Sequence, residues 1–281
     1  MSDERRDGHG FGVLVLAHGG SARWNRSVQE MTDQAKLDYP AEVVFGMGMH
    51  AEEVLAMQQA LNALKREGIS RLIVVPLLVS SFSEVMRQFE YLFGLRDESP
   101  WPGHVKPLSL QELPVTLTPP LNDDPIVAEI LLERAQALSR APEEETVILV
   151  AHGPNDEEDN ARWLQVMGRL AQSIQAQGRF RAVVPVTLRD DALESVKQDA
   201  TRKLRALVEE GSAYGRSLVV PLLIASGGIE HKIPQRLQGL SYAFQENGLL
   251  PHPKLSQWLV QRVQQQRATV SSSDEEASVV P

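Results

Sequence analysis

Short uninterrupted runs of apolar residues alternate along this chain with longer segments whose apolar residues recur at helical spacing. The runs at 12–17, 42–47 and 71–79 are typical of strands that are buried on both faces of a parallel sheet. The segments at 22–38 and 51–66 between them have the periodicity of amphipathic helices. This alternation of strands and helices predicts a parallel, doubly wound sheet.

The second half of the chain repeats the order of the first, which is the strongest organisational signal in the sequence. The duplication predicts an α/β fold of two tandem doubly wound parallel-sheet units with a pseudo-twofold relation. We place the units at 8–140 and 141–266, and we expect the polar, low-complexity residues 267–281 to form a disordered tail. The remaining predicted elements are helices at 84–93, 125–139, 157–177, 191–210 and 254–265, and strands at 104–110, 146–151, 181–188 and 217–224.

Histidine and glutamate residues follow the predicted strands at equivalent places in both halves. His18 and His152 each follow a first strand in the sequence Ala-His-Gly, and Glu84 and Glu230 each follow a third strand, with His231 next to the second glutamate. Open α/β sheets bind ligands at the carboxyl ends of their strands, so each pair could meet in one crevice. Imidazole and carboxylate groups suit a divalent metal ion or the removal of protons.

Simpler explanations exist for the same residues. A histidine beside glycine at a strand end is often only a hydrogen-bonded turn residue, and a glutamate in the first turn of a helix, such as Glu84, is favoured by the helix dipole. Trp24 and Trp163 fit best as core residues of their helices, with stacking on a flat ligand as the alternative.

Composition narrows the choice of ligand. The chain of 281 residues has no cysteine, which excludes disulfides and thiolate metal sites, and its formal charge of −9 argues against nucleic acid and anionic membranes as partners. No apolar run approaches the length of a membrane span, and the charged N-terminus has no apolar core behind it. We therefore expect a cytoplasmic protein that acts on a small molecule.

Together these motifs resemble the class II tetrapyrrole chelatase superfamily, which includes sirohydrochlorin cobaltochelatases, sirohydrochlorin ferrochelatases and protoporphyrin ferrochelatases. The resemblance rests on Ala-His-Gly in both halves, the Val-Pro-Leu-Leu strands at 75–78 and 220–223, and the segments 80–84 and 226–230 that close them. It covers nearly the whole chain up to about residue 266. Long members of the superfamily contain two fused units, so the resemblance implies a monomer with an internal pseudo-dimer.

The resemblance implies that a divalent metal ion enters a tetrapyrrole in a cleft between the units, and that neither a nucleotide nor any cofactor is used besides that metal, which is cobalt, iron or nickel. Sirohydrochlorin or a related tetrapyrrole is the expected partner, in the biosynthesis of siroheme, cobalamin or porphyrin. Phe82 and Gly228 stand where the ferrochelatase-type segment has histidine, so a non-catalytic carrier of metal or tetrapyrrole is the main alternative. The implied catalytic and metal-binding residues are His18, Glu84, His152 and Glu230, with His231 as an additional metal ligand.

Two further expectations concern the surroundings of these residues. Gly227 and Gly228 give a flat ligand room in the second half, whereas Phe82 would fill that space in the first, so we expect the chemistry in the second half. A hydrolase that uses Ser80 or Ser226 is a weaker alternative, because no Gly-x-Ser-x-Gly turn is present. Cations that could hold tetrapyrrole carboxylates are Arg23, Arg87, Arg162 and Lys232.

Overall fold

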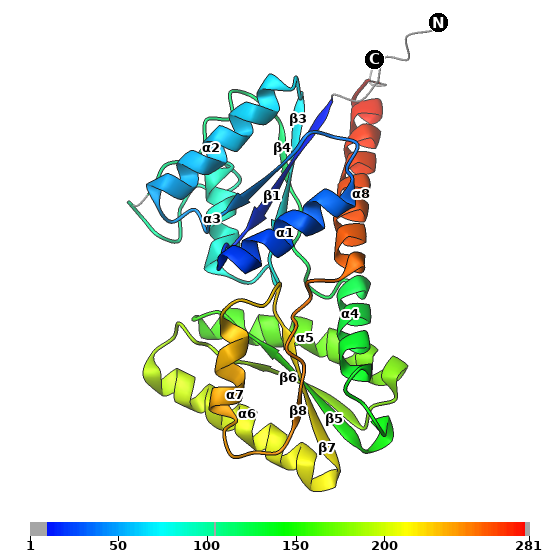
Figure 1. Cartoon of the computed structure of the whole chain (residues 1–281). Coiled ribbons are helices and arrows are strands. Elements are labelled where there is room, and N and C mark those ends of the chain that lie inside the picture. The colour runs from blue at the N-terminus through cyan, green and yellow to red at the C-terminus, as the bar shows by residue number, and fades with distance from the viewer. Residues whose placement is uncertain (1–9, 104, 279–281) are drawn as a thin grey trace, which may run out of the picture.

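Two α/β units of like topology make up the chain, for which a computed structural model describes residues 10–103 and 105–278 (Figure 1). The first half contains β1 (Phe11–Ala17), α1 (Ala22–Ala35), β2 (Ala41–Phe45), α2 (Ala51–Arg66), β3 (Arg71–Leu77), α3 (Glu84–Leu92), β4 (Val115–Leu117) and α4 (Pro125–Gln136). The second half contains η1 (Pro142–Glu144), β5 (Glu145–Ala151), α5 (Glu157–Gly178), β6 (Ala182–Thr187), α6 (Glu194–Tyr214), β7 (Arg216–Leu222), η2 (Ile229–His231), α7 (Lys232–Arg236), β8 (Ala243–Phe244) and α8 (Pro253–Ser278).

Both sheets are parallel, and their strand orders are equivalent: β2-β1-β3-β4 in the first and β6-β5-β7-β8 in the second. The first and third strands of each half are therefore neighbours, with Val13 opposite Ile73 in one sheet and Ile148 opposite Val219 in the other. This pairing brings the loops after β1 and β3, and those after β5 and β7, to one edge of their sheet. The predicted tandem, doubly wound α/β architecture is confirmed.

The fourth strand of each unit differs from the prediction. Residues 105–110 form no strand, His104 lies outside the described residues, and β4 is found further along the chain. The apolar residues of 105–110 pack against α2 and α3 instead: Leu108 is buried, and its N–H donates to the carbonyl of Leu92. β8 was not predicted.

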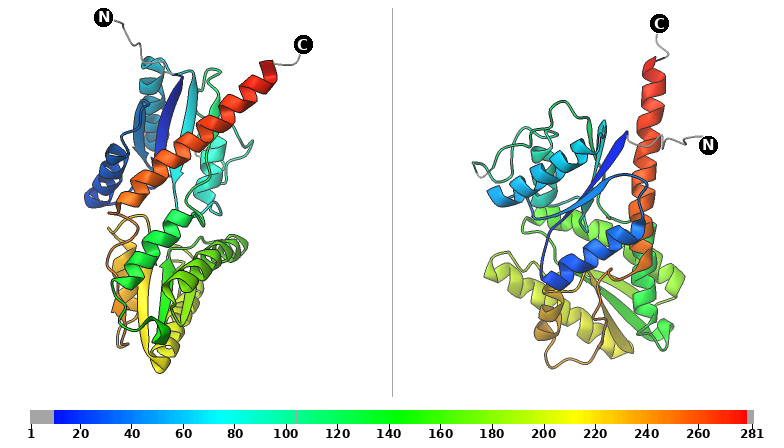
Figure 2. Two further views of the ribbon diagram at one scale, coloured as in Figure 1. Left: turned by 90° about the vertical axis from the view of Figure 1, so that its right-hand side faces the viewer. Right: turned by 45° about the horizontal axis from the view of Figure 1, so that its top comes forward.

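Helices α4 and α8 lie on the sheets of opposite halves. α8, the last helix of the second half, packs on α1 and β3, whereas α4, the last helix of the first half, packs on α5 and β7 (Figure 2). The buried Ser256 of α8 anchors this exchange by donating to the carbonyl of Met31 in α1 over 2.9 Å. Each compact body therefore contains one helix from the other half of the sequence. One hydrophobic core runs through both bodies.

α8 continues beyond the point where the sequence predicted a disordered tail. Its backbone is helical up to Ser278, and residues 279–281 lie outside the described residues. Arg267, near this end, donates a hydrogen bond of 2.7 Å to the hydroxyl of Tyr39. Extending a helix that has already formed fixes few dihedral angles for each bond gained, which favours this continuation. Within the described part of the chain, no helix is both long and apolar enough to cross a membrane.

Candidate functional site

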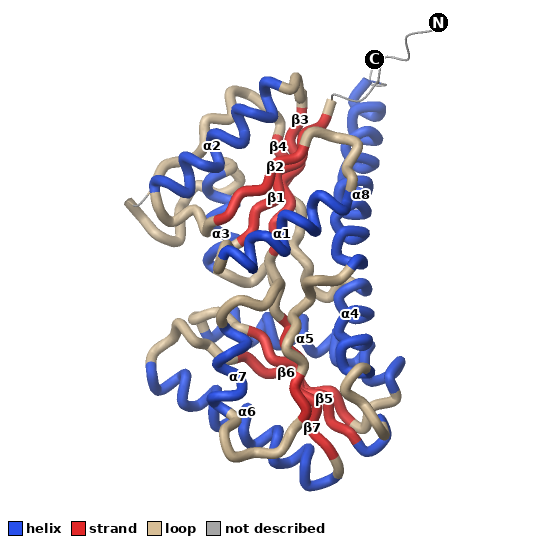
Figure 3. Tube along the Cα trace, in the orientation of Figure 1, coloured by secondary structure: helices blue, strands red, loops and turns tan. Residues whose placement is uncertain are grey.

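A cleft of about 550 Å³ lies between the two units. The loops that follow the strands of both sheets, drawn in tan in Figure 3, come together in the same region. This volume is within the usual range for small-molecule sites. His18 and Glu84 from the first unit and His152 and Glu230 from the second all line it. The expected placement of these side chains in one shared cleft is thus confirmed, while their chemical roles stay predictions.

The second unit holds its pair of residues firmly. His152 Nε2 is 3.0 Å from Asp191 Oδ2, and a carboxylate accepts, so Nε2 carries the hydrogen. In the neutral ring the lone pair is then on Nδ1, which is buried and has no hydrogen-bond partner among the described residues. Glu230 is only 4% exposed, and its Oε2 accepts the N–H of Gly228 over 2.9 Å.

The first unit presents its pair more openly. His18 is exposed, and its Nδ1 lies 2.8 Å from the carbonyl oxygen of Gly19. Because a carbonyl only accepts, Nδ1 carries the hydrogen and Nε2 keeps a lone pair for a metal ion or a proton. Glu84 is the exposed first residue of α3, whose N-terminus is capped by the Ser83 hydroxyl.

His231 does not join the other four residues. Its side chain is 78% exposed, it does not line the cleft, and its Nε2 lies 3.4 Å from Glu230 Oε1. The described residues include no group of three or more histidine, aspartate or glutamate side chains placed to hold a metal ion. The predicted set of five metal ligands is therefore not brought together in this structure.

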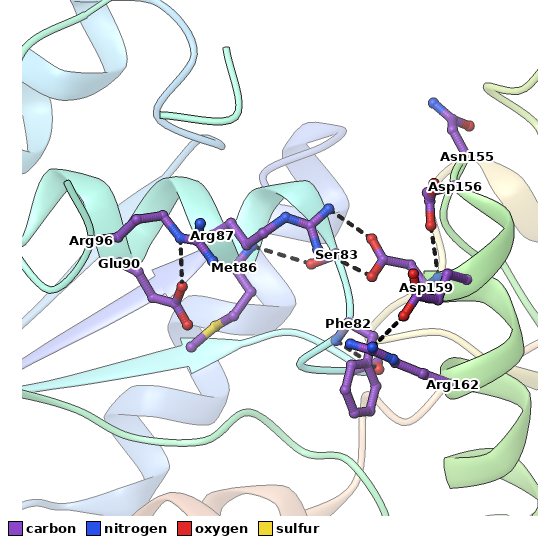
Figure 4. Close-up of polar contacts among 12 residues, drawn as sticks. Phe82, Ser83, Met86, Arg87, Glu90, Arg96, Asn155, Asp156, Asp159 and Arg162 are labelled. Carbon is purple, nitrogen blue, oxygen red and sulfur yellow. Dashed lines mark hydrogen bonds and ion pairs between the residues drawn. The ribbon is translucent and has the colours of Figure 1, made fainter. Parts of the chain in front are cut away.

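Phe82 and Gly227 have other roles than those predicted. Phe82 does not line the cleft; its ring lies below the guanidinium of Arg162, 5.7 Å away, on the side of α5 (Figure 4). A Cβ at Gly227 would lie 2.7 Å from Ser21 Oγ and 3.1 Å from Trp24 Cβ, so this glycine lets the two units touch. Gly228 does keep open space beside it and lines the cleft, as expected.

An ion pair between the units stands at the wall of the cleft. Arg87 of α3 donates two hydrogen bonds, of 3.1 and 2.7 Å, to the carboxylate of Asp159 in α5 (Figure 4). These bonds to Asp159 raise the pKa of the Arg87 guanidinium, although burial opposes the change. The sequence had suggested that Arg87 could hold a substrate carboxylate, but Arg87 is already bonded to Asp159. Neither Arg23 nor Lys232 lines the cleft.

Apolar side chains form much of the remaining wall. Trp24 packs edge-on against Phe45, with ring centres 6.3 Å apart, and also faces the cleft. Trp163 is 9% exposed and belongs to the core, yet it lines the cleft, and its Nε1 has no partner among the described residues. Trp163 is thus a core residue, as expected, whereas Trp24 is half-buried and packs against the core, and both line the cleft.

Sequence analysis missed Asp156, Asp159 and Asp191, which all line the cleft. Asp191 carried a usable signal, because it follows β6 at the ligand-binding edge of the sheet. The other two lie in the first turn of α5 and at its N-cap, where carboxylates are common for reasons of helix stability alone. Nothing in the sequence shows which of these side chains reaches the cleft.

Comparison with known proteins gives a consistent result. The model of the CbiX family matches residues 12–138 and 146–266. No curated protein matches the chain. SirB from Bacillus subtilis, solved with Fe³⁺, matches with a TM-score of 0.66 and 16% identity over 93% of this chain and 97% of SirB.

Two further solved structures have the same fold. CbiX, described as the terminal enzyme of siroheme biosynthesis in denitrifying bacteria, gives a TM-score of 0.56 at 14% identity over 90% of this chain and 98% of its own. DR2241 from Deinococcus radiodurans, a multi-domain protein with structural similarity to chelatases, gives 0.56 at 19% identity over 90% of this chain and 55% of its own.

Proposed function

The chain belongs to the CbiX family, and we propose that it is a chelatase that inserts a divalent metal ion, cobalt or ferrous iron, into sirohydrochlorin or a related tetrapyrrole without a nucleotide. The observation that carries the proposal is that histidine and glutamate residues from both units line one cleft between the sheets. Cobalt, nickel and ferrous iron all bind well to imidazole nitrogen. A carboxylate beside the bound ion can accept the protons that the pyrrole nitrogens lose.

The proposed roles follow from the environment of each residue. His18 offers a free Nε2 to the arriving metal ion, because its other nitrogen is bonded to the Gly19 carbonyl. His152 Nε2 is paired with Asp191 and its Nδ1 is buried, so we propose that the ring turns or exchanges Asp191 for the metal ion when it acts as a ligand. Glu230, inside the cleft wall, is the proposed acceptor of pyrrole protons. The metal is a substrate here, and no resident cofactor is proposed.

A non-catalytic carrier of metal or tetrapyrrole is the second candidate. It is favoured by the lack, among residues 10–103 and 105–278, of any group of three or more possible metal ligands. Phe82 and Gly228, where a ferrochelatase-type site has histidine, point the same way.

One assay separates the two candidates. Purified full-length protein is mixed with sirohydrochlorin or with a porphyrin, each with cobalt, nickel or ferrous iron, and the absorbance bands of the metallated product are followed over time. A chelatase accelerates their appearance relative to the reaction without protein, and the double variant His18→Ala/His152→Ala does not. A carrier changes the spectrum on binding but leaves the rate of metallation unchanged, and that result would overturn the proposal.

A further inference from the structure

Three large apolar side chains line the cleft without belonging to a hydrophobic core. Met47 and Met49 lie in the loop after β2, Trp101 lies in the loop after α3, and all three are half-buried. None of them is a member of the hydrophobic clusters found among the described residues, and none packs against one. Trp24 and Trp163 differ in this respect, because they pack against the core or in it. Core packing therefore does not explain why these three side chains, here called the apolar wall, line the cleft.

A fully buried glutamine connects the two loops that carry the apolar wall. Gln88 lies in α3, and its Nε2 donates to the carbonyl of Gly48, between the two methionines, over 2.7 Å. Its Oε1 accepts from the hydroxyl of Ser99 over 2.7 Å, and the oxygen of that hydroxyl accepts the N–H of Trp101 over 3.0 Å. A buried amide whose oxygen and nitrogen are both bonded holds the groups around it in one arrangement.

The loop after β2 is held at two further points. Gly48 has a φ of +74°, in the left-handed region, and a Cβ there would lie 2.4 Å from Cδ1 of Leu92 in α3. Glu53 Oε2 accepts the N–H of Met49 over 2.9 Å. The backbone that carries the two methionines therefore has a fixed place before any ligand binds, which lowers the cost of binding.

The second unit has an equivalent bond with polar residues beside it. Arg236 of α7 donates to the carbonyl of Leu188, after β6, over 2.8 Å, as Gln88 of α3 donates to that of Gly48, after β2. The residues that follow at 189–191 are Arg-Asp-Asp. The loop after a second strand can thus be held to its helix without apolar side chains, so the methionines of the first unit are not required for this bond.

The apolar wall is close to one of the proposed chemical groups. Glu84 and Gln88 are four residues apart in α3, so they lie on the same face of the helix, about 6 Å apart along its axis. Glu84 lines the cleft beside the wall that Gln88 supports. A ligand in contact with the wall is therefore within reach of a carboxylate.

From these observations we propose, resting on the proposed chelatase function, that the apolar wall binds one face of the tetrapyrrole and that Gln88 and Ser99 are its positioning residues. Aromatic and thioether side chains both make favourable contacts with a flat conjugated ring. The contact involves the face of the ring, so it places no condition on the side chains at the ring's edge. The wall thus sets the plane in which the ring lies between the two units.

The first test removes the aromatic ring of the wall. Two metal-free probes, sirohydrochlorin and a porphyrin with propionate side chains, are titrated into the full-length protein and followed by absorbance. For the probe that binds more tightly, Trp101→Ala should raise the Kd about tenfold, and Trp101→Phe, which keeps a ring, no more than about threefold. In cobalt insertion, Trp101→Ala should raise the KM for this probe by a similar factor at unchanged kcat, because the wall holds the ring before and during the reaction alike.

The matched control truncates an apolar side chain of the same loop outside the cleft. Leu95 follows α3, is 53% exposed and does not line the cleft. Leu95→Ala should therefore change neither the Kd nor the KM.

The second test concerns the positioning residues. Ser99→Ala breaks the link between Gln88 and Trp101 and leaves the bond to Gly48 in place, so it should raise the Kd about threefold. Ser99→Thr keeps the hydroxyl and should restore most of the affinity. In a Trp101→Ala background, Ser99→Ala should have no further effect, because Ser99 acts through Trp101. An equal effect of Ser99→Ala in both backgrounds would show a general loss of structure and overturn the positioning role.

The outcomes distinguish this inference from the function on which it rests. If Trp101→Ala binds both probes as tightly as the unchanged protein, or if Leu95→Ala is equally damaging, the inference is wrong while the chelatase proposal stands. A loss of kcat at unchanged KM in Trp101→Ala would overturn it too. If the unchanged protein binds neither probe, both proposals are wrong. If Trp101→Ala weakens binding as expected but the unchanged protein metallates neither probe, the role of the wall is correct and the chelatase proposal fails.

Discussion

The two histidines of the cleft differ in how firmly the protein holds them. His152 is 26% exposed and lies 3.0 Å from the exposed Asp191, and Glu230 of the same unit is buried. His18 and Glu84 are both exposed. We expected the chemistry in the second half because Phe82 would fill the ligand space of the first half. That reason is wrong, since Phe82 does not line the cleft. The greater burial of the second pair now supports the same expectation, because buried side chains keep the fixed geometry that catalytic groups need.

We predict unequal effects of substitutions in the two halves. His152→Ala and Glu230→Gln should abolish metal insertion, while His18→Ala and Glu84→Gln should mainly weaken binding of the substrate. The measurement is the metallation rate at saturating tetrapyrrole, where a pure binding defect disappears and a lost catalytic group does not. The assignment to the second half fails if His18→Ala is as damaging as His152→Ala under these conditions.

The sequence revealed those side chains that directly follow a strand and little beyond them. His18, His152, Glu84 and Glu230 could be found because the edge of a parallel sheet fixes where they lie. The direction of Phe82 towards Arg162, and the pairing of Arg87 with Asp159, depend on how the two units pack. No local pattern contains that information.

Among the elements, the long strands and helices were predictable, whereas the fourth strands and the helix exchange were not. β4 and β8 are too short to show a periodicity, and each pairs only with the edge of its third strand. The amphipathic faces of α4 and α8 predict burial but do not say against which sheet. The same apolar faces of α4 and α8 would be buried whether each helix packed on the sheet of its own half or on that of the other half. The sequence therefore does not reveal the exchange.

The last part of α8 should be dispensable for stability. Removing residues 267–281 breaks the exposed bond between Arg267 and Tyr39, and such surface contacts contribute about 0–1 kcal/mol. We expect the melting temperature to change by less than about 2 °C. Ser256→Ala, in the buried part of the same helix, should cost about 1 kcal/mol and lower it by about 2–4 °C. A larger loss from the truncation than from Ser256→Ala would show that the end of α8 docks on the protein.

At the scale of the whole molecule, contacts on two sides of the cleft hold the units together. The exchanged helices α4 and α8 run along one side in Figure 1, and α3 lies on the other. On the α3 side the connection is made by Arg87 and Asp159, with Phe82 and Arg162 beside them (Figure 4). The helices join the units through a continuous core, so we expect the ion pair to set how far the cleft can open.

Breaking this ion pair should both destabilise the protein and widen the cleft. Arg87→Met leaves the Asp159 carboxylate, which is 5% exposed, without its partner, at a cost of about 2 kcal/mol in urea unfolding. The distance between the units is measured by energy transfer between dyes on Leu95→Cys and Leu193→Cys, because both positions are exposed and the chain has no other cysteine.

The matched control removes an arginine from the same region without touching the interface. Arg96→Met breaks a pair with Glu90 of α3, in the first unit, so it should change neither stability nor the distance. The exchanged pair Arg87→Asp/Asp159→Arg should recover part of both losses, since the two charges still meet across the units. A dye distance that is the same in Arg87→Met and in the unchanged protein would mean that the other contacts between the units, and not this ion pair, fix the opening of the cleft.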